Sequence, residues 1–490
     1  MLQKGFFMKR IMAVCLLTAV LLASCGENSR IDTEKSGIEN EDTSTAAPET
    51  TDPSRVSDLP EKYDLGDYEL TVAKTSPETN FWALGTFAVD EENGEVLNDA
   101  IYRRNLEVTE NYNFRITEIN FNSNPVDKVN TSVLAGDDEY RLALLELRNV
   151  SSTANGNYLN LYDLEWLSPE KVWWDQNIQR DLTIGGRLTM LTGDILVADN
   201  DAMMMTMYYR PLADDYKFEN LYDAVREGRW TYDLMLGLAK KVSSDLDGND
   251  TWDENDRYGL LYVNNSAAEP YFASSCTYLY QIENGKPEFT GDSERAHELF
   301  EMMNKILSDN TIAFDWSRIT QNTSAKIAEM IGNKQVLFQN MVLSFVRRNY
   351  RDIELDFGLL PLPKFDEEQE KYSTMINLST PFIFVPASVA EPDKVGFALE
   401  ALAAASDDIT DSYYSVCMES KYTRDAESFE MIKLASENIT YDPGFIYDWG
   451  GLGTTIRASI MNLGGNYASL IAQNAPASKQ AMQDFLEDIE

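Results

Sequence analysis

The sequence predicts an α/β fold, and two observations support this prediction. From about residue 65 onward, segments with the short apolar runs of strands alternate with segments that show the apolar repeat of helices. Hydrophobic residues make up 43% of the 490 residues and aromatic residues 11%, which is enough for a sizeable core in two or three domains. The chain is therefore expected to be globular, despite its strongly acidic composition.

The expected helices and strands follow one another along the chain. Thr231 is expected to cap a helix that buries Leu234, Leu238 and Val242. A later helix carries the single histidine, His297, beside an apolar stripe that omits it, so His297 is expected on the flank of that helix. In chain order we expect a helix at 97–112, strands at 113–117 and 141–147, helices beginning at 151 and covering 232–242, strands at 336–338, 357–360 and 381–386, and a helix at 394–405.

The first 25 residues have the pattern of a bacterial lipoprotein signal. Lys4, Lys9 and Arg10 precede an apolar run from residue 11 to residue 23, which is too short to span a bilayer comfortably. The run ends in Leu-Ala-Ser before Cys25 and resembles the lipobox of lipoproteins. We therefore expect residues 1–24 to be a signal peptide and Cys25 to be lipidated, which anchors the protein on the extracellular face of the cell membrane.

Residues 25–64 are expected to comprise the lipidated cysteine and a disordered acidic tether. From residue 26 to residue 60 the chain is rich in Ser, Thr, Glu, Asp and Pro and contains no aromatic residue. Such a segment buries too little apolar area to offset its ordering entropy. After processing, Cys276 and Cys417 remain, and the sequence leaves open whether they form a disulfide or stay as free thiols.

Charge and missing motifs exclude several classes of function. With 81 acidic against 41 basic residues, the formal net charge of −40 repels phosphate backbones and excludes a nucleic-acid partner. A Ser-His-Asp or Cys-His enzyme would depend entirely on His297, which is expected on a helix flank. The sequence also lacks the motifs of P-loop ATPases, Rossmann dehydrogenases, α/β-hydrolases and Cys-x-x-Cys redox proteins.

The sharpest local motif is an acidic loop that begins at Asp245. Numbered as an EF-hand-like loop, its positions 1, 3, 5, 7, 9 and 12 are Asp245, Asp247, Asn249, Thr251, Asp253 and Asp256. Oxygen ligands at this spacing predict a structural Ca²⁺ site. The loop departs from the usual pattern at position 6, which is Asp250 instead of Gly, and at position 12, which is Asp instead of Glu. The alternative is an Asx-rich turn on a solvated surface.

Several short segments after residue 65 occur in the order seen in one known family. They are EVLNDAI (95–101), LAGDDEY (134–140), WWDQ (173–176), REGRWT (226–231), GNKQVLF (332–338), FGLLP (357–361) and YDWGG (447–451). Together with the lipobox, they resemble extracellular solute-binding proteins of family 1, the group that includes maltose-binding proteins. The resemblance covers essentially all of the chain after residue 65.

The resemblance implies a two-lobed, periplasmic-binding-protein-like clamp, joined by hinge segments that cross between the lobes. Crossings are expected near residues 205, 375 and 410. Lobe one then comprises residues 65–205 and 375–410, and lobe two comprises residues 206–374 and 411–490. The methionines at 203–205 and 207, near the first crossing, are expected to fill the core.

The positions that the resemblance places near the cleft carry the residue types that sugars need. Sugars offer apolar C–H faces and hydroxyl rims, so their sites pair aromatic platforms with polar hydrogen-bonding groups. The candidate ligand-binding residues are Trp82, Asp199, Asn200, Asp201, Tyr209, Asn340 and Trp449. For each of them, core packing or a role in a turn is the alternative.

The expected function is that of a lipid-anchored extracellular receptor of an ABC importer, which binds a neutral sugar or oligosaccharide and performs no reaction. Its expected partners are the solute, the ABC permease subunits and, through the lipid anchor, the membrane, and the protein is expected to be a monomer. One alternative is an extracellular glycoside hydrolase, which needs two carboxylates and no histidine. The other is a peptide or amino-acid receptor with the same clamp. The sequence does not choose between monosaccharide and oligosaccharide.

Overall fold

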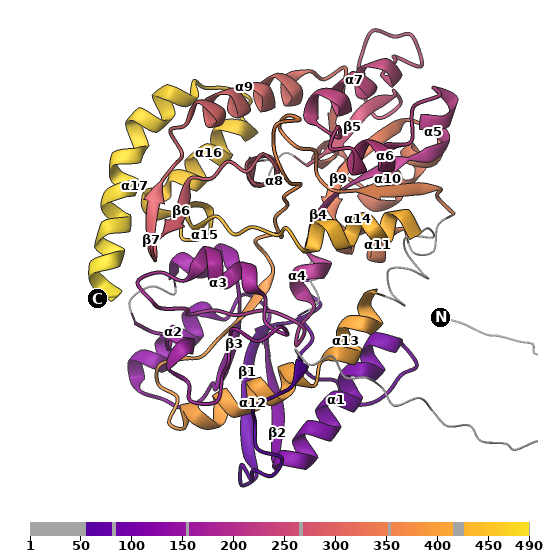
Figure 1. Ribbon diagram of the computed structural model, residues 1–490. Helices are drawn as coiled ribbons and strands as arrows, with labels where there is room; N and C mark the ends of the chain where they lie inside the picture. Colours follow the sequence, from indigo (N-terminus) through magenta and orange to yellow (C-terminus); the bar gives the residue numbers. More distant parts are fainter. Residues whose placement is uncertain are drawn as a thin grey trace, which may run out of the picture. The chain divides into compact units, whose positions relative to one another are not determined.

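The computed structural model describes residues 55–80, 85–152, 156–263, 268–350, 354–414 and 426–489. The expected signal peptide, Cys25, Trp82 and Cys417 lie outside these residues. Cys276 is half-buried. No helix within the described ranges is long and apolar enough to cross a membrane. The described residues belong to one compact unit that contains two α/β lobes (Figure 1).

The first lobe is built on a four-stranded sheet with the order β11-β3-β1-β2. Its strands are β1 (Tyr68–Thr75), β2 (Phe114–Phe121), β3 (Leu142–Glu146) and β11 (Pro381–Phe384). β1 is parallel to β2 and β3, whereas β11 runs antiparallel to β3. Helices α1 (Val96–Tyr112) and α2 (Val126–Ala135) connect these parallel strands, because parallel strands need a crossover connection. Since β11 comes from far later in the chain, two separate stretches of sequence build this lobe.

The second lobe is built on a five-stranded sheet with the order β10-β4-β9-β5-β8. Its strands are β4 (Met204–Tyr209), β5 (Tyr258–Tyr262), β8 (Ala313–Asp315), β9 (Val336–Val342) and β10 (Phe357–Leu360). β5 is parallel to β8 and β9, whereas β4 runs antiparallel to β9 and β10. Every residue of β9 is buried, which fits its central place in a sheet covered by helices.

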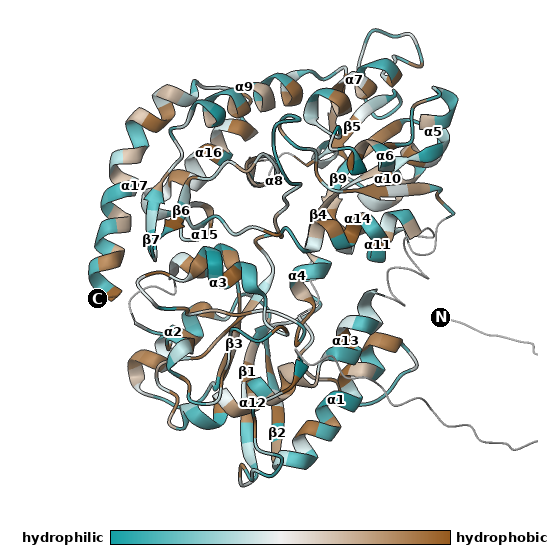
Figure 2. Cartoon of the chain, viewed as in Figure 1, coloured by the Kyte–Doolittle hydropathy of each residue, from teal (hydrophilic) through white to brown (hydrophobic). Residues whose placement is uncertain are grey.

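Most of the remaining elements are helices that cover the sheets or extend the second lobe. Figure 2 shows the long α17 as alternating hydrophilic and hydrophobic bands, as expected of a helix with one buried face. The remaining helices are α3 (Gln176–Leu182), α4 (Ala198–Asp201), α5 (Arg210–Asp215), α6 (Leu221–Arg226), α7 (Tyr232–Val242), α8 (Ala268–Ser274), α9 (Glu294–Ser308), α10 (Thr323–Gly332), α11 (Leu343–Asn349), α12 (Pro392–Ala404), α13 (Asp407–Asp411), α14 (Ala426–Ser436), α15 (Pro443–Ile446), α16 (Leu452–Met461) and α17 (Tyr467–Ile489). The 3₁₀ helices are η2 (Leu147–Ser152), η3 (Leu161–Asp163), η5 (Trp316–Arg318) and η7 (Trp449–Gly451), and β6 (Tyr280–Glu283) with β7 (Lys286–Phe289) forms a hairpin.

Local sequence signals predict several elements correctly and two features wrongly. The Thr231 hydroxyl accepts a hydrogen bond from the Leu234 N–H at 3.3 Å and caps α7, as expected. His297 lies half-buried on α9, where its Nε2 contacts Asp292 Oδ1 at 2.8 Å. Leu234, however, is only half-buried, because the buried face of α7 runs through Met235 instead. The helix expected from residue 151 is also wrong, since residues 147–152 form the 3₁₀ helix η2 and Tyr158 lies in an isolated β-bridge with Pro386.

Three described segments lie side by side where the lobes meet, at 202–204, 374–377 and 438–440. The Met204 N–H donates to the Met375 carbonyl at 2.9 Å, and the Asn377 N–H donates to the Ala202 carbonyl at 2.9 Å. The Thr440 N–H donates to the Thr374 carbonyl at 2.9 Å. The first two segments carry the chain from one sheet to the other and back, close to the positions expected for crossings near 205 and 375.

The expected crossing near 410 falls at α13. Beyond this helix, the hydroxyls of Tyr413 and Tyr414 donate to side chains of α4, at Asp201 and Asn200 respectively. After residues 415–425, which lie outside the described ranges, α14 packs on β10 of the second lobe. The hydrogen-bonded segment at 438–440 is a part of the hinge that sequence reasoning did not anticipate.

The segment from residue 55 to residue 64, expected to be part of the tether, is packed against the first lobe. Arg55 Nη2 donates to Asp194 Oδ2 at 2.6 Å, and Arg55 Nη1 lies 2.8 Å from Asp407 Oδ1. The ring of Tyr63 stacks on Phe397 with centroids 4.4 Å apart. These contacts correct the expected end of the tether, because ion pairs and ring packing hold residues that the composition alone assigns to a solvated segment.

Candidate functional site

A cavity of about 760 Å³ lies between the lobes, beside the paired hinge segments. The first lobe contributes Arg148 from η2 and the segment 377–379 before β11. The second lobe contributes the end of β9 together with α8, η5, α11 and α16. The lining residues are Arg148, Met204, Val263, Glu269, Pro270, Trp316, Ser317, Asn340, Met341, Val342, Phe345, Met375, Asn377, Leu378, Ser379, Thr454, Arg457, Ala458 and Met461.

Trp316 forms the aromatic part of the cavity wall. It opens the short η5 helix directly after β8, and Asp315 caps that helix by accepting a hydrogen bond from the Ser317 N–H at 3.0 Å. The Trp316 ring is half-buried and lies 6.2 Å from the ring of Phe345, which is itself buried. The Trp316 side chain thus packs near Phe345 of the second lobe and also lines the cavity, where an indole can serve as a stacking platform for a ligand.

A buried ion pair lies on the second-lobe side of the cavity. Arg457 on α16 donates from Nη1 to Glu269 Oε1 on α8 at 2.7 Å, and from Nη2 to the Thr454 hydroxyl at 3.0 Å. Glu269 is 6% exposed, and within the described part of the chain its second carboxylate oxygen has no hydrogen-bond partner. Part of the Arg457 guanidinium therefore stays open at the cavity wall, while the buried Glu269 carboxylate compensates its charge.

Arg148 is the charged residue on the first-lobe side. Its Nη2 donates to the Ser379 hydroxyl, and its Nε lies 3.4 Å from Glu146 Oε2 at the end of β3. The Arg148 side chain is 54% exposed, whereas that of Glu146 is only 13% exposed. Burial raises the pKa of Glu146 above its usual value. Arg148 is thus oriented by the two neighbours while part of its guanidinium stays open to the cavity.

The floor of the cavity is formed by the hinge and the end of β9. Met204 faces Val342 across the β4–β9 pair, and the Met204 N–H is bonded to the Met375 carbonyl. Asn340, expected as a ligand contact, lines the cavity, and its side-chain carbonyl accepts a hydrogen bond from Thr206 at 2.9 Å. Its amide NH₂ is therefore the group that it can offer to a ligand.

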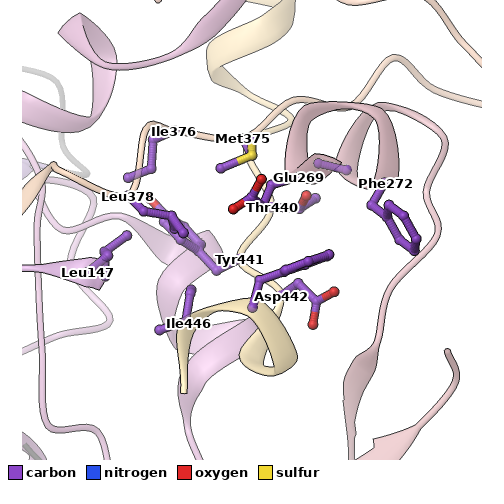
Figure 3. Close-up of a pocket in the computed structure, with 12 residues that line it drawn as sticks. Leu147, Glu269, Phe272, Met375, Ile376, Leu378, Thr440, Tyr441, Asp442 and Ile446 are labelled. Atoms are coloured by element: carbon purple, nitrogen blue, oxygen red, sulfur yellow. The ribbon is translucent and has the colours of Figure 1, made fainter. Parts of the chain in front are cut away.

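A smaller pocket of about 20 Å³ shares Glu269, Met375 and Leu378 with the larger cavity. Figure 3 shows Tyr441 in the middle of this pocket, between Glu269 and Ile446. The volume is enough for about one water molecule. The pocket is thus a narrow extension of the cleft into the hinge.

The acidic candidates on α4 hold the hinge and do not line the cavity. Asp201 is fully buried and accepts hydrogen bonds from Arg347, and the Asn200 side-chain oxygen accepts a hydrogen bond from the Tyr414 hydroxyl. Asp199 is buried beside Asp175, and burial, followed by the charge of Asp175, raises the pKa of Asp199 to about 7. These side chains are close to the crossing, as expected, but their partners lie within the protein.

The aromatic candidates other than Trp82 lie in packed regions. Tyr209 is buried at the end of β4 away from the hinge, where it pairs with Phe357. Trp449 is buried between Tyr447, at 5.1 Å with nearly parallel rings, and Tyr280, at 5.0 Å. Neither residue lines the cavity. Both have the core-packing role that was the alternative for an aromatic candidate.

The acidic loop brings three of its six candidate cation ligands together. One carboxylate oxygen each from Asp245, Asp247 and Asp256 lie within 4.8 Å of one another. Asp250 at position 6 has φ of 59°, the left-handed conformation that a glycine would adopt at this point of the loop. Oxygen ligands that converge in this way fit a hard cation such as Ca²⁺.

The same loop is also held by its own backbone. Asp245 accepts hydrogen bonds from the N–H groups of Gly248 at 2.6 Å and Asp250 at 2.9 Å, and the bond from Asp250 is the main cause of a lowered Asp245 pKa. Asn249 and Asp253 accept from backbone N–H groups two residues further on. The loop leads into β5 at the end of the second sheet away from the cavity, so any bound cation there would act on stability rather than on ligand contact.

Sequence reasoning missed Arg148, Glu269, Trp316 and Arg457 as residues of the cleft. Trp316 follows a three-residue strand, and the other three lie on helical elements that no local motif marks. A weak signal exists on α16, where Thr454, Arg457, Ala458 and Met461 recur at the spacing of one helix face. That spacing alone does not tell which surface the face meets.

No family model matches the sequence, and no curated protein matches it. Solved structures do match. A cyclo/maltodextrin-binding protein complexed with maltotetraose has 14% identity and a TM-score of 0.53, covering 86% of this chain and 96% of its own. The galacto-N-biose-/lacto-N-biose I-binding protein of the ABC transporter from Bifidobacterium longum has 12% identity and a TM-score of 0.54, covering 86% and 98%.

An ABC substrate-binding protein from Listeria monocytogenes in complex with cycloalternan has 13% identity and a TM-score of 0.51, again covering 86% of this chain and 98% of its own. These likenesses confirm the expected fold: the chain has the two-lobed α/β architecture of ABC substrate-binding proteins.

Proposed function

We propose that the protein is the substrate-binding receptor of an ABC importer and binds a neutral sugar or oligosaccharide in the interlobe cleft. The observation that carries this proposal is the cavity of about 760 Å³, which takes Arg148 from one lobe and Trp316 with Arg457 from the other. An indole platform together with guanidinium, amide and hydroxyl groups is the set of side chains that recognises a sugar ring.

The charges that line the cleft support a neutral ligand. Arg457 is paired with Glu269 at 2.7 Å, and Arg148 lies 3.4 Å from Glu146. Each arginine therefore keeps hydrogen-bond donors for hydroxyl groups while its charge is largely compensated. The remaining polar lining residues, Asn340, Asn377, Ser317, Ser379 and Thr454, are uncharged.

Ligand binding is coupled to closure of the lobes. A ligand that contacts both Arg148 and Trp316 interacts better with a closed arrangement than with an open one, so it shifts the population toward closure. The rotation would take place at the segments 202–204 and 374–377, which carry the chain between the lobes and are joined by backbone hydrogen bonds. The importer's permease subunits would then recognise the closed form.

The glycoside hydrolase alternative has less support. Such an enzyme needs two carboxyl groups that flank the scissile bond. Among the described residues that line the cavity, Glu269 is the one acid, and it is already bonded to Arg457. The protein therefore binds and releases its ligand without reaction.

The location and partners of the receptor follow from its front end and its family resemblance. We propose that Cys25 is lipidated after removal of residues 1–24, and that the protein acts as a monomer on the extracellular face of the cell membrane. The apolar run before Leu-Ala-Ser-Cys supports this proposal. Metabolic labelling with a lipid precursor tests it, because Cys25→Ala should remove the label and release the protein from the membrane.

We also propose that the loop from Asp245 to Asp256 binds a structural Ca²⁺ ion. The three carboxylate oxygens that converge within 4.8 Å, and the left-handed Asp250 at position 6, support this assignment. Thr251 would contribute its carbonyl oxygen, as position 7 does in an EF-hand loop.

A ligand screen with product analysis tests the receptor function. The mature protein is mixed with a panel of mono- and oligosaccharides and of short peptides, and melting temperature and products are measured. A ligand at 100 times its Kd should add about 2.7 kcal/mol to the unfolding free energy. Saturable sugar binding without products is expected. Turnover would overturn the proposal in favour of a hydrolase, and binding of peptides alone would favour a peptide receptor.

A further inference from the structure

The lining of the cleft is more apolar than plain oligosaccharides require. Four methionines line it, Met204, Met341, Met375 and Met461, in addition to valine, leucine, proline and alanine side chains. Trp316 is the one half-buried aromatic residue among the described lining residues, because Phe345 is only 4% exposed. A chain of several sugar rings would use several platforms, each with polar groups at its rim. In this cleft, Trp316 is the single such platform among the described lining residues, and most of the other lining side chains are apolar.

The polar and apolar parts of this lining are separated along one helix. On α16, Thr454 and Arg457 form the polar part of the lining face, and Ala458 and Met461 form the apolar part. Arg457 and Met461 lie one turn apart, which is about 6 Å along the helix axis. This separation is similar to the distance between the centre of a sugar ring and a substituent attached to that ring.

Met461 is the clearest sign of an apolar ligand group. It is 43% exposed at the end of α16, although it lines the same cavity as Arg457. A large apolar side chain that stays in contact with water gains free energy when a ligand covers it. Methionine side chains are flexible and polarizable, so they adapt to substituents of different shapes, including aromatic rings.

We infer that the cleft prefers a glycoside whose sugar carries an aryl or alkyl substituent. The sugar ring stacks on Trp316 and bonds to Arg457 and Arg148, and the substituent lies against the methionines. This inference rests on the proposed function, since it presumes that a sugar binds in this cleft. It goes further, because it names the kind of group attached to that sugar.

Matched ligand pairs test the inference. Isothermal titration of the mature protein compares methyl, hexyl and phenyl glycosides of glucose, galactose and mannose in both anomeric forms, with phenol and hexanol as controls without a sugar. For each sugar that binds, the phenyl or hexyl glycoside is expected to bind at least about ten-fold more tightly than the methyl glycoside. The controls without a sugar are expected not to bind.

Two variants at the end of α16 show where the substituent lies. Met461→Gln is expected to reduce the ratio of phenyl-glycoside to methyl-glycoside affinity by at least about three-fold, because this ratio isolates the contribution of the substituent. Leu463→Gln is the matched control, because Leu463 is 39% exposed nearby and does not line the cavity. Thermal melts check that both variants stay folded.

The outcomes separate this inference from the proposed function. Equal affinities for methyl and phenyl glycosides would overturn the inference and leave a sugar receptor. Loss of the preference in Leu463→Gln as well as in Met461→Gln would also overturn it, because the effect would then not be local to the cleft. If no glycoside binds but a plain oligosaccharide does, the inference is again wrong. If no sugar of any kind binds, the proposed function itself falls.

Discussion

Arg347 donates two hydrogen bonds to the buried carboxylate of Asp201, from Nε to Oδ1 at 3.0 Å and from Nη2 to Oδ2 at 2.7 Å. Arg347 lies on α11 of the second lobe, and Asp201 ends α4 directly before the first crossing. The Tyr413 hydroxyl donates to the same carboxylate at 3.3 Å. The hydrogen bonds to Asp201 therefore join α4, which precedes the first crossing, both to the second lobe and to the segment after α13.

Asp201→Asn should destabilise the fold. The substitution removes a buried charge and leaves Arg347 with a weaker partner, so the free energy of unfolding should fall by about 2 kcal/mol. Urea unfolding measures this change. Asp215→Asn is the control, since it breaks an exposed ion pair with Lys334 and should change stability by less than about 0.5 kcal/mol. Equal effects of the two substitutions would contradict the structural role of Asp201.

Trp316→Ala should weaken ligand binding without unfolding the protein. The half-buried ring lines the cavity, so its loss should raise the Kd for the sugar found in the screen by about ten-fold, which is about 1.4 kcal/mol. Trp449→Phe is the contrasting variant, because Trp449 is buried between rings away from the cavity. It should lower the melting temperature and leave the Kd unchanged. A raised Kd in Trp449→Phe together with an unchanged Kd in Trp316→Ala would indicate that the ligand binds at Trp449 instead.

Arg457→Gln should weaken binding of the same sugar and also affect stability. Glu269 is 6% exposed and would lose its ion-pair partner, so the unfolding free energy should fall by about 1 to 3 kcal/mol. Arg148→Gln removes a half-exposed guanidinium on the opposite wall, so it should raise the Kd while changing stability by less than about 1 kcal/mol. Titration calorimetry and urea unfolding of both variants separate the two effects. An unchanged Kd in both would contradict ligand contact from two lobes.

Stability should fall as the pH rises from about 4 to about 7. Burial raises the pKa of Asp199 to about 7, so this carboxyl is neutral in the folded protein over a range in which it is charged in the unfolded chain. The folded state then binds more protons, and each such group costs up to about 1.4 kcal/mol per pH unit across that window. Asp175 and Asp194 are the charged groups near Asp199, and both raise its pKa. Burial and the charge of Asp199 in turn raise the pKa values of the neighbouring Tyr414 and Tyr441 hydroxyls.

Asp199→Asn should make this pH dependence less steep. Urea unfolding at pH 5 and at pH 8 measures the difference in the wild type and in the variant. Part of the slope should remain, because burial also raises the pKa of Asp442 and Glu400 to about 7. Asp408→Asn, at an exposed position on α13, is the control that should leave the slope unchanged. A wild-type protein that becomes more stable over this interval would contradict the prediction.

Calcium should raise the melting temperature of the mature protein relative to EDTA. If Ca²⁺ is present at 100 times its Kd, the gain should be about 2.7 kcal/mol. Asp247→Asn should abolish most of the gain, because it removes one of the three converging carboxylates. Asp250→Asn is the matched control in the same loop, since position 6 supplies no ligand. If Ca²⁺ produces neither binding heat in calorimetry nor a shift of the melting temperature in the wild type, the proposed calcium site is wrong.

Local patterns in the sequence were sufficient for the α/β class and for several elements of the fold, but not for the helix expected from residue 151. The cap at Thr231, the stripe that leaves His297 on a flank, and the alternation of strands and helices depend on neighbours within one or two turns. Asn340 was a candidate only through the family resemblance, and the structure places it within β9, where it lines the cavity.

Tertiary structure decided which side chains reach the cleft. Arg148, Glu269, Trp316 and Arg457 are far apart in the chain and meet because two lobes fold against each other. In the same way, Arg347 on α11 and Tyr413 bind the Asp201 carboxylate and give it a structural role at the hinge. Tyr447 and Tyr280 pack against Trp449 and keep it in the core. Residue type states what a side chain can bind, but its partners are set by long-range packing that no local window contains.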